Sequence, residues 1–154
     1  MHRPLIEQYA AGESKLSAAL EGLTEGDLLA RPGPGDWSIH ELVIHVVDSD
    51  LVGSDRMKRI IAENDPPLVA FDENRWIANH YPHAQSLDNA LALFVASRRQ
   101  MGTILRNLPD VAFSRAGVHS ERGRLTLETI VQTFVTHLDH HLGFLREKRQ
   151  RLGK

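Results

Sequence analysis

The 154-residue sequence contains no cysteine. Disulfide bonds, thiolate metal sites and cysteine nucleophiles are therefore excluded. Aromatic residues make up only 6% of the chain, and no apolar run reaches the roughly 18 residues that a membrane-spanning helix requires. The first residues lead into a mixed polar pattern rather than the apolar segment of a signal peptide. These absences predict a cytoplasmic protein with no membrane partner.

Neither sign of charge is in marked excess. Eighteen Lys and Arg residues against twenty Asp and Glu residues give a net charge of -2, and no basic block is present. Sequence-independent nucleic-acid binding requires a cationic surface that neutralises phosphates, so we expect no nucleic-acid partner. The hydrophobic content of 42% is typical of a globular protein, and the length fits one domain over residues 1–154.

Helical periodicity dominates the sequence, and no segment shows convincing period-two alternation. Long amphipathic stretches cover residues 4–23, 38–63, 86–108 and 126–149, with short helices expected at 25–30 and 73–79. Four long helices, each with one apolar face, predict an all-α four-helix bundle. The connectors are longer than the 2–8 residues of tight bundle turns. We therefore expect long crossover connections, above all over residues 68–85.

Two of the nine histidines lie four residues apart on the last predicted helix. His141 falls within the apolar stripe of that helix and His137 lies on its edge, whereas His140 is rotated toward solvent. Imidazoles at this spacing share one helix face and can bind a single metal ion. The alternative is a pair of surface or hydrogen-bonded core histidines, and His140 is a less favoured substitute for His137 as a ligand.

His45 is a third candidate, on the flank of the apolar stripe of the helix predicted over residues 38–63. A buried imidazole needs a partner for each of its nitrogens. A neighbouring helix that presents His137 and His141 would supply one through a bound cation. The alternative is a hydrogen bond from His45 to Asp48 or to a backbone carbonyl.

Two motifs together resemble a known family. They are Arg31-Pro32-Gly33-Pro34-Gly35-x-Trp37-Ser38-x-x-Glu41-x-x-x-His45-x-x-Asp48 and, about 90 residues later, His137-x-x-x-His141. This combination is similar to the DinB-like family of metal-binding four-helix bundles, which includes YfiT-like metal-dependent hydrolases and bacillithiol- or mycothiol-dependent S-transferases. The resemblance extends over essentially the whole chain.

The resemblance implies that His45, His137 and His141 hold a divalent metal, Ni²⁺ or Zn²⁺, and that the chain forms a homodimer. Three neutral imidazoles leave at least one coordination position open, which is the catalytic pattern for zinc. The implied activity is hydrolysis of a small molecule by activated water. One alternative is transfer of a low-molecular-weight thiol, and another is a non-catalytic metal-binding or stress-related interaction bundle.

Two charged residues are candidates for catalytic roles beside the metal. Asp48 lies one turn after His45, where it is either a general base or an acceptor that orients a ligand imidazole. Arg98 interrupts the apolar stripe of the helix predicted over 86–108, and an unpaired buried charge there would cost several kcal/mol. It is expected either to pair with Glu41 or Asp48 or to extend to solvent, or else to bind an anionic group of the substrate.

Overall fold

A computed structural model describes residues 1–154 of the chain. The elements, in chain order, are α1 (Arg3–Ala19), α2 (Glu25–Leu29), α3 (Ile39–Ala62), β1 (Pro67–Leu68), α4 (Glu73–Asn79), η1 (Pro82–Ala84), α5 (Leu87–Arg106), η2 (Asp110–Ser114), β2 (Ala116–His119), β3 (Gly123–Thr126) and α6 (Leu127–Arg151), where η1 and η2 are 3₁₀ helices.

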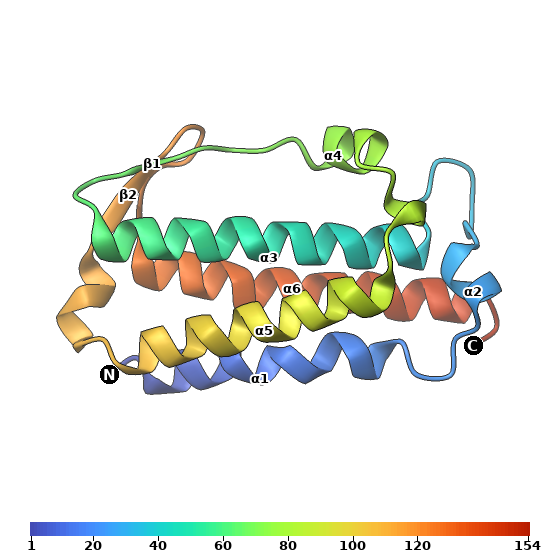
Figure 1. Cartoon of the computed structure of the whole chain (residues 1–154), viewed down its shortest axis with the longest axis horizontal. Helices are drawn as coiled ribbons and strands as arrows, with labels where there is room; N and C mark the ends of the chain where they lie inside the picture. Colours follow the sequence, from blue (N-terminus) through green and yellow to red (C-terminus); the bar gives the residue numbers. More distant parts are fainter.

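The four long helices, α1, α3, α5 and α6, form a bundle (Figure 1). Helices α1 and α6 run in one direction, whereas α3 and α5 run in the other (Figure 1). Each helix packs against two neighbours, and α3 lies between α5 and α6. The parallel pair α3 and α5 can be adjacent because the segment between them returns over the length of α3 (Figure 1). The predicted four-helix bundle with a long crossover is confirmed.

Helix boundaries follow from local backbone chemistry. Ser38 caps α3: its hydroxyl accepts a hydrogen bond from the Glu41 N–H, and its own N–H donates to the Glu41 carboxylate. This reciprocal pair satisfies two N–H groups that a helix start leaves without partners. Helix α1 ends at Ala19, earlier than the expected residue 23, because the chain turns at Gly22, whose φ of +77° is left-handed.

The connectors contain a three-stranded sheet in the order β1-β2-β3, with β1 parallel and β3 antiparallel to β2. The sequence did not reveal these strands, because segments of two to four residues are too short to show alternation. A side chain at Gly117 would lie 2.9 Å from the side chain of Leu68. The absence of a Cβ at this position therefore allows β1 and β2 to approach, which fixes the start of the crossover.

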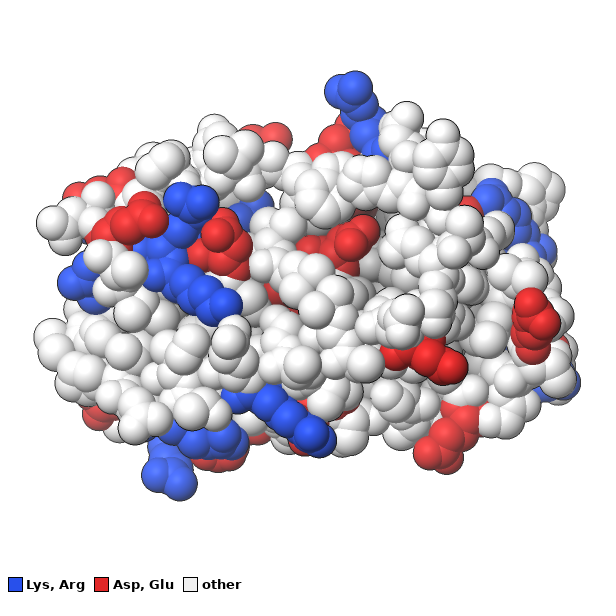
Figure 2. Space-filling model, viewed as in Figure 1, with Lys and Arg blue, Asp and Glu red and all other residues white.

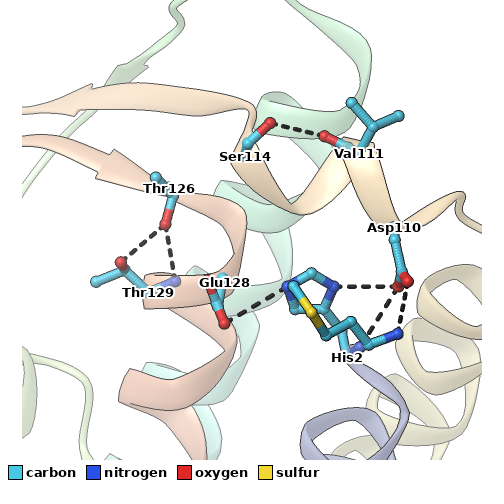
Figure 3. Close-up of polar contacts among 8 residues, drawn as sticks. His2, Asp110, Val111, Ser114, Thr126, Glu128 and Thr129 are labelled. Atoms are coloured by element: carbon cyan, nitrogen blue, oxygen red, sulfur yellow. Dashed lines mark hydrogen bonds and ion pairs between the residues drawn. The ribbon is translucent and has the colours of Figure 1, made fainter.

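The first residues of the chain are fixed at the end of the bundle where the sheet lies. The His2 imidazole lies between two carboxylates, 3.1 Å from Asp110 and 3.5 Å from Glu128 (Figure 3). The same ring stacks on Phe113, with 4.3 Å between the ring centroids. These contacts join the beginning of α1 to η2 and to the first turn of α6. They hold together three segments that are distant in sequence.

One buried guanidinium connects all four helices of the bundle. Arg98 of α5 is only 1% exposed, and its Nε and Nη2 donate to Oδ1 of Asp50 on α3 at 3.0 and 2.7 Å. Its Nη1 donates to the carbonyl of Tyr9 on α1 at 2.9 Å. Its Nη2 also donates to the carbonyl of Phe134 on α6 at 3.0 Å. A side chain at Gly12 of α1 would lie 2.2 Å from Nη1, so the space for the guanidinium depends on that glycine.

This placement corrects both expectations for Arg98. Its carboxylate partner is Asp50, which the sequence analysis did not consider, rather than Glu41 or Asp48. Because its donors are directed to groups within the bundle core, Arg98 is not available to bind an anionic substrate group. The guanidinium also faces the Tyr9 ring, at 4.4 Å, and the Phe94 ring, at 4.9 Å. Those rings belong to the two apolar clusters of the core, which Arg98 therefore bridges.

The outer surface agrees with the charge balance of the sequence. On the face shown in Figure 2, Lys and Arg side chains are interspersed with Asp and Glu and form no continuous basic patch. None of the helices combines the length and the apolar character needed to cross a lipid bilayer.

We expect Arg98→Met to destabilise the protein by about 3–5 kcal/mol, because it leaves the Asp50 carboxylate buried without its partner. For a chain of this size each kcal/mol corresponds to about 2–4 °C in the melting midpoint. The control is Arg99→Met, which removes an exposed pair with Glu13 and is expected to cost no more than about 1 kcal/mol. Thermal unfolding followed by circular dichroism measures both, and equal losses for the two variants would contradict the role of Arg98.

Candidate metal centre

Three histidines from two helices converge on one point between α3 and α6. His45 comes from α3, whereas His137 and His141 come from successive turns of α6. One ring nitrogen of each lies within 4.8 Å of those of the other two. The Nε2 atoms of His45 and His141 are only 3.2 Å apart. The structure thus brings together all three residues that the sequence analysis proposed as metal ligands.

Close packing of α3 on α6 permits this convergence. At Gly53 of α3, a Cβ atom would lie 2.5 Å from the ring of Phe134 on α6. The glycine therefore lets the two helices approach two turns from His45 and one turn from His137. Behind His45, the Trp37 ring packs at 5.1 Å between centroids. The imidazoles are consequently positioned by the packing of the helices that carry them.

Burial keeps all three imidazoles neutral. Removal from water disfavours the charged form, so the pKa of His45 falls to about 4, that of His137 to about 3 and that of His141 to about 4. Neighbouring imidazoles lower these pKa values further, because imidazolium charges close together would repel one another. His141 lowers the pKa of His45, both of these rings lower that of His137, and His140 lowers that of His141. At neutral pH each ring therefore has a free nitrogen lone pair, the form in which histidine binds metals.

The residues fit a divalent cation. Two nitrogens bound to one ion at about 2.1 Å can lie no more than about 4.2 Å apart, and the His45 and His141 nitrogens satisfy that limit. Neutral imidazoles are common ligands of divalent transition metals. Three of them, with ring nitrogens that converge on one point, are a donor set that a metal ion would complete.

Asp48 does not belong to the group of converging donor atoms, and its expected role beside the metal stays a prediction. Its carboxylate is half-buried, which raises its pKa, and the charged neighbour that acts on it is His80, at the end of α4. The carboxylate that approaches the cluster is Glu73, whose Oε2 lies 3.8 Å from Nε2 of His45. The sequence analysis missed Glu73 because it lies on a short helix without apolar periodicity, so nothing indicated which way that helix faces.

A cavity of about 430 Å³ opens beside the cluster. It is lined by residues from α3, α4, α6 and the segment before α3, namely Gly35, Asp36, Trp37, Leu42, Glu73, Asn74, His141, Phe144, Glu147, Lys148 and Arg151. Its volume lies within the range of small-molecule sites. Because His141 and Glu73 both belong to its lining, a small molecule in this cavity would reach the histidine cluster.

The chain is similar to proteins described as metal-dependent hydrolases. It is 28% identical over 141 residues to "Putative metal-dependent hydrolase YfiT" of Bacillus subtilis, covering 91% of this chain and 79% of that protein. A "Putative metal-dependent hydrolase" of Bacillus licheniformis is also 28% identical, over 89% of this chain and 78% of the relative.

Solved structures share the fold. The structure of YfiT from Bacillus subtilis, described as "a probable metal-dependent hydrolase with an unusual four-helix bundle topology", superposes with a TM-score of 0.90 at 26% identity, over 98% of this chain and 87% of that chain. The mycothiol-dependent maleylpyruvate isomerase superposes with a TM-score of 0.75 at 16% identity, over 94% of this chain and 60% of that chain. The DinB superfamily model matches residues 8–145, and the chain belongs to that superfamily.

Proposed function

We propose that this protein is a metal-dependent hydrolase of a small molecule, in which His45, His137 and His141 bind one divalent ion. The observation that carries the proposal is the convergence of three neutral imidazoles beside a cavity of small-molecule size. The similarity to proteins described as metal-dependent hydrolases supports the same reaction class. Imidazole donors without thiolates suit Ni²⁺ or Zn²⁺.

When bound by three neutral imidazoles, such an ion keeps its full charge and can lower the pKa of a coordinated water to about 7. The protein's own residues fix the geometry. His137 and His141 are held one turn apart on α6, and His45 is packed against Trp37. The ammonium of Lys148 donates to the Trp37 carbonyl at 2.6 Å, which holds this wall of the cavity to α6.

Thiol transfer is the second candidate. The observation that favours it is the shared fold of a mycothiol-dependent isomerase. The same open coordination position would bind a substrate thiolate in place of water. The two functions differ in what is consumed: a transferase uses up a low-molecular-weight thiol together with an electrophile, whereas a hydrolase turns over in buffer without thiol.

We expect protein purified without a histidine tag to bind about one equivalent of Ni²⁺ or Zn²⁺, and His141→Ala to lose most of that binding because one of three ligands is removed. His140→Ala is the matched control, since His140 is adjacent in sequence but lies outside the cluster. Metal content after dialysis is measured by mass spectrometry. Full metal content in the His141→Ala variant would exclude this residue as a ligand.

The neutral imidazoles also predict a pH dependence for metal-free protein. In the unfolded chain each histidine titrates near 6.5, but in the folded chain the pKa values of His45 and His141 are about 4 and that of His137 about 3. Between pH 6.5 and 4 the unfolded state thus binds protons that the folded state does not, so stability falls as the pH falls.

Thermal melts of chelator-treated protein measure this effect. The melting midpoint is expected to fall on acidification from pH 7 to 5, by about 2–4 °C for each kcal/mol of stability lost. His137→Gln removes one titrating group and should make the fall shallower. A midpoint that rose on acidification, or an identical slope in the variant, would contradict the neutral cluster.

A further inference from the structure

One carboxylate beside the histidine cluster has no role in the bundle. Glu73, the first residue of α4, places its Oε2 3.8 Å from Nε2 of His45. No lysine or arginine lies within ion-pair distance of it, and His45 is the only basic group that does. Its side chain is about half exposed, at 54%, and belongs to the lining of the cavity that also contains His141.

The short helix that carries Glu73 is fixed on the bundle. Ile77 is only 7% exposed and packs in the same apolar cluster as residues of α3 and α6. Residues four apart share one face of a helix, so the face of α4 that anchors Ile77 is also the face of Glu73. The Asp72 carboxylate caps α4 by accepting from the Arg75 N–H at 3.0 Å.

The rest of the crossover holds α4 in register along α3. Before the helix, the carbonyl of Val69 accepts a hydrogen bond from the Arg56 guanidinium of α3, at 2.6 Å. The Phe71 ring packs on Trp76 of α4 at 4.7 Å. After the helix, Pro82 is buried. With contacts on both sides of α4, the packing of the crossover fixes the backbone of Glu73 beside the cluster.

The distance is compatible with direct ligation. Two atoms bound to one ion, an imidazole nitrogen at about 2.0–2.1 Å and a carboxylate oxygen at about 2.0–2.2 Å, lie no more than about 4.3 Å apart. The 3.8 Å between Glu73 and His45 falls within that limit, as does the 3.2 Å between His45 and His141. Glu73 does not belong to the group of donor atoms that all lie within 4.8 Å of one another, so its half-exposed side chain must turn toward His137 and His141 to share their ion. Carboxylate oxygens also occur beside imidazoles among zinc ligands, as in His₂Glu sites.

We propose that Glu73 is a fourth protein ligand of the ion held by His45, His137 and His141, supplied by the crossover rather than by the bundle. This inference rests on the proposed metal site and adds a residue to it. The metal would then join α4 to α3 and α6, so that metal binding and the position of the crossover over the cavity depend on one another.

The test is metal affinity together with ligand-field spectra. Co²⁺ is titrated into untagged, chelator-treated wild type, Glu73→Gln, Asp48→Asn and Glu147→Gln. Affinity is measured by competition against a chromogenic chelator, and coordination by visible absorption. Glu147→Gln is the matched control, because it removes the same charge from the same cavity. We expect Glu73→Gln to bind Co²⁺ about 10–100-fold more weakly with an altered d–d spectrum, and Glu147→Gln to resemble wild type.

The possible results distinguish failure of the Glu73 assignment from failure of the three-histidine site. If Glu73→Gln keeps the affinity and spectrum of wild type, or if Glu147→Gln weakens binding equally without a spectral change, Glu73 is not a ligand although the three-histidine site stands. If Asp48→Asn, and not Glu73→Gln, changes the spectrum, the carboxylate has been assigned to the wrong residue. If wild type binds no Co²⁺, Ni²⁺ or Zn²⁺, the proposed function fails together with this inference.

Discussion

The buried ion pair between Arg98 and Asp50 is the interaction on which the bundle depends. A guanidinium in an apolar core is costly unless its donors are satisfied, and here they are satisfied by groups from α1, α3 and α6 at once. These contacts require groups of α1, α3 and α6 to face Arg98 at the same time, which constrains the register of the four helices. Because Phe134 lies one turn before His137 on α6, the same register determines where the histidine cluster forms.

The crossover between α3 and α5 supplies one wall of the cavity beside the histidine cluster. An up-down bundle with tight turns would make α3 and α5 antiparallel and leave the outer face of α3 open. In this chain the segment between them returns over α3, and its start is fixed by the parallel pairing of β1 with β2. It carries α4 over the beginning of α3, where His45 lies. The cavity therefore has walls from the bundle and from the crossover, and a metal there would contact both.

Much of this was predictable from the sequence. Apolar spacing located the four long helices, and the Ser38–Glu41 capping box marked the start of α3. The i,i+4 spacing indicated that His137 and His141 share a face. The residues that these side chains contact on other helices were harder to predict, because such contacts depend on which helices are adjacent. Arg98 was expected to be paired, but the choice of Asp50 follows from the rotation of α3 relative to α5.

The orientation of Glu73 and the positions of the strands were not predictable from the sequence, because the segments that contain them are short. The helix over residues 73–79 was expected, but seven residues are too few to show which of its faces packs on the bundle. Strands of two to four residues are too short to show alternation. Asp48, one helical turn from His45, was the obvious carboxylate by spacing. The fold instead brings one from 28 positions along the chain, a proximity that arises only because the crossover doubles back.

The central claim is that three imidazoles from α3 and α6 share one ion, and anomalous diffraction tests it most directly. Crystals of Ni²⁺-loaded protein, measured on both sides of the nickel absorption edge, are expected to show one strong anomalous peak within bonding distance of nitrogens from His45, His137 and His141. A peak bound to other residues, with these three rings still in contact with one another, would contradict the account.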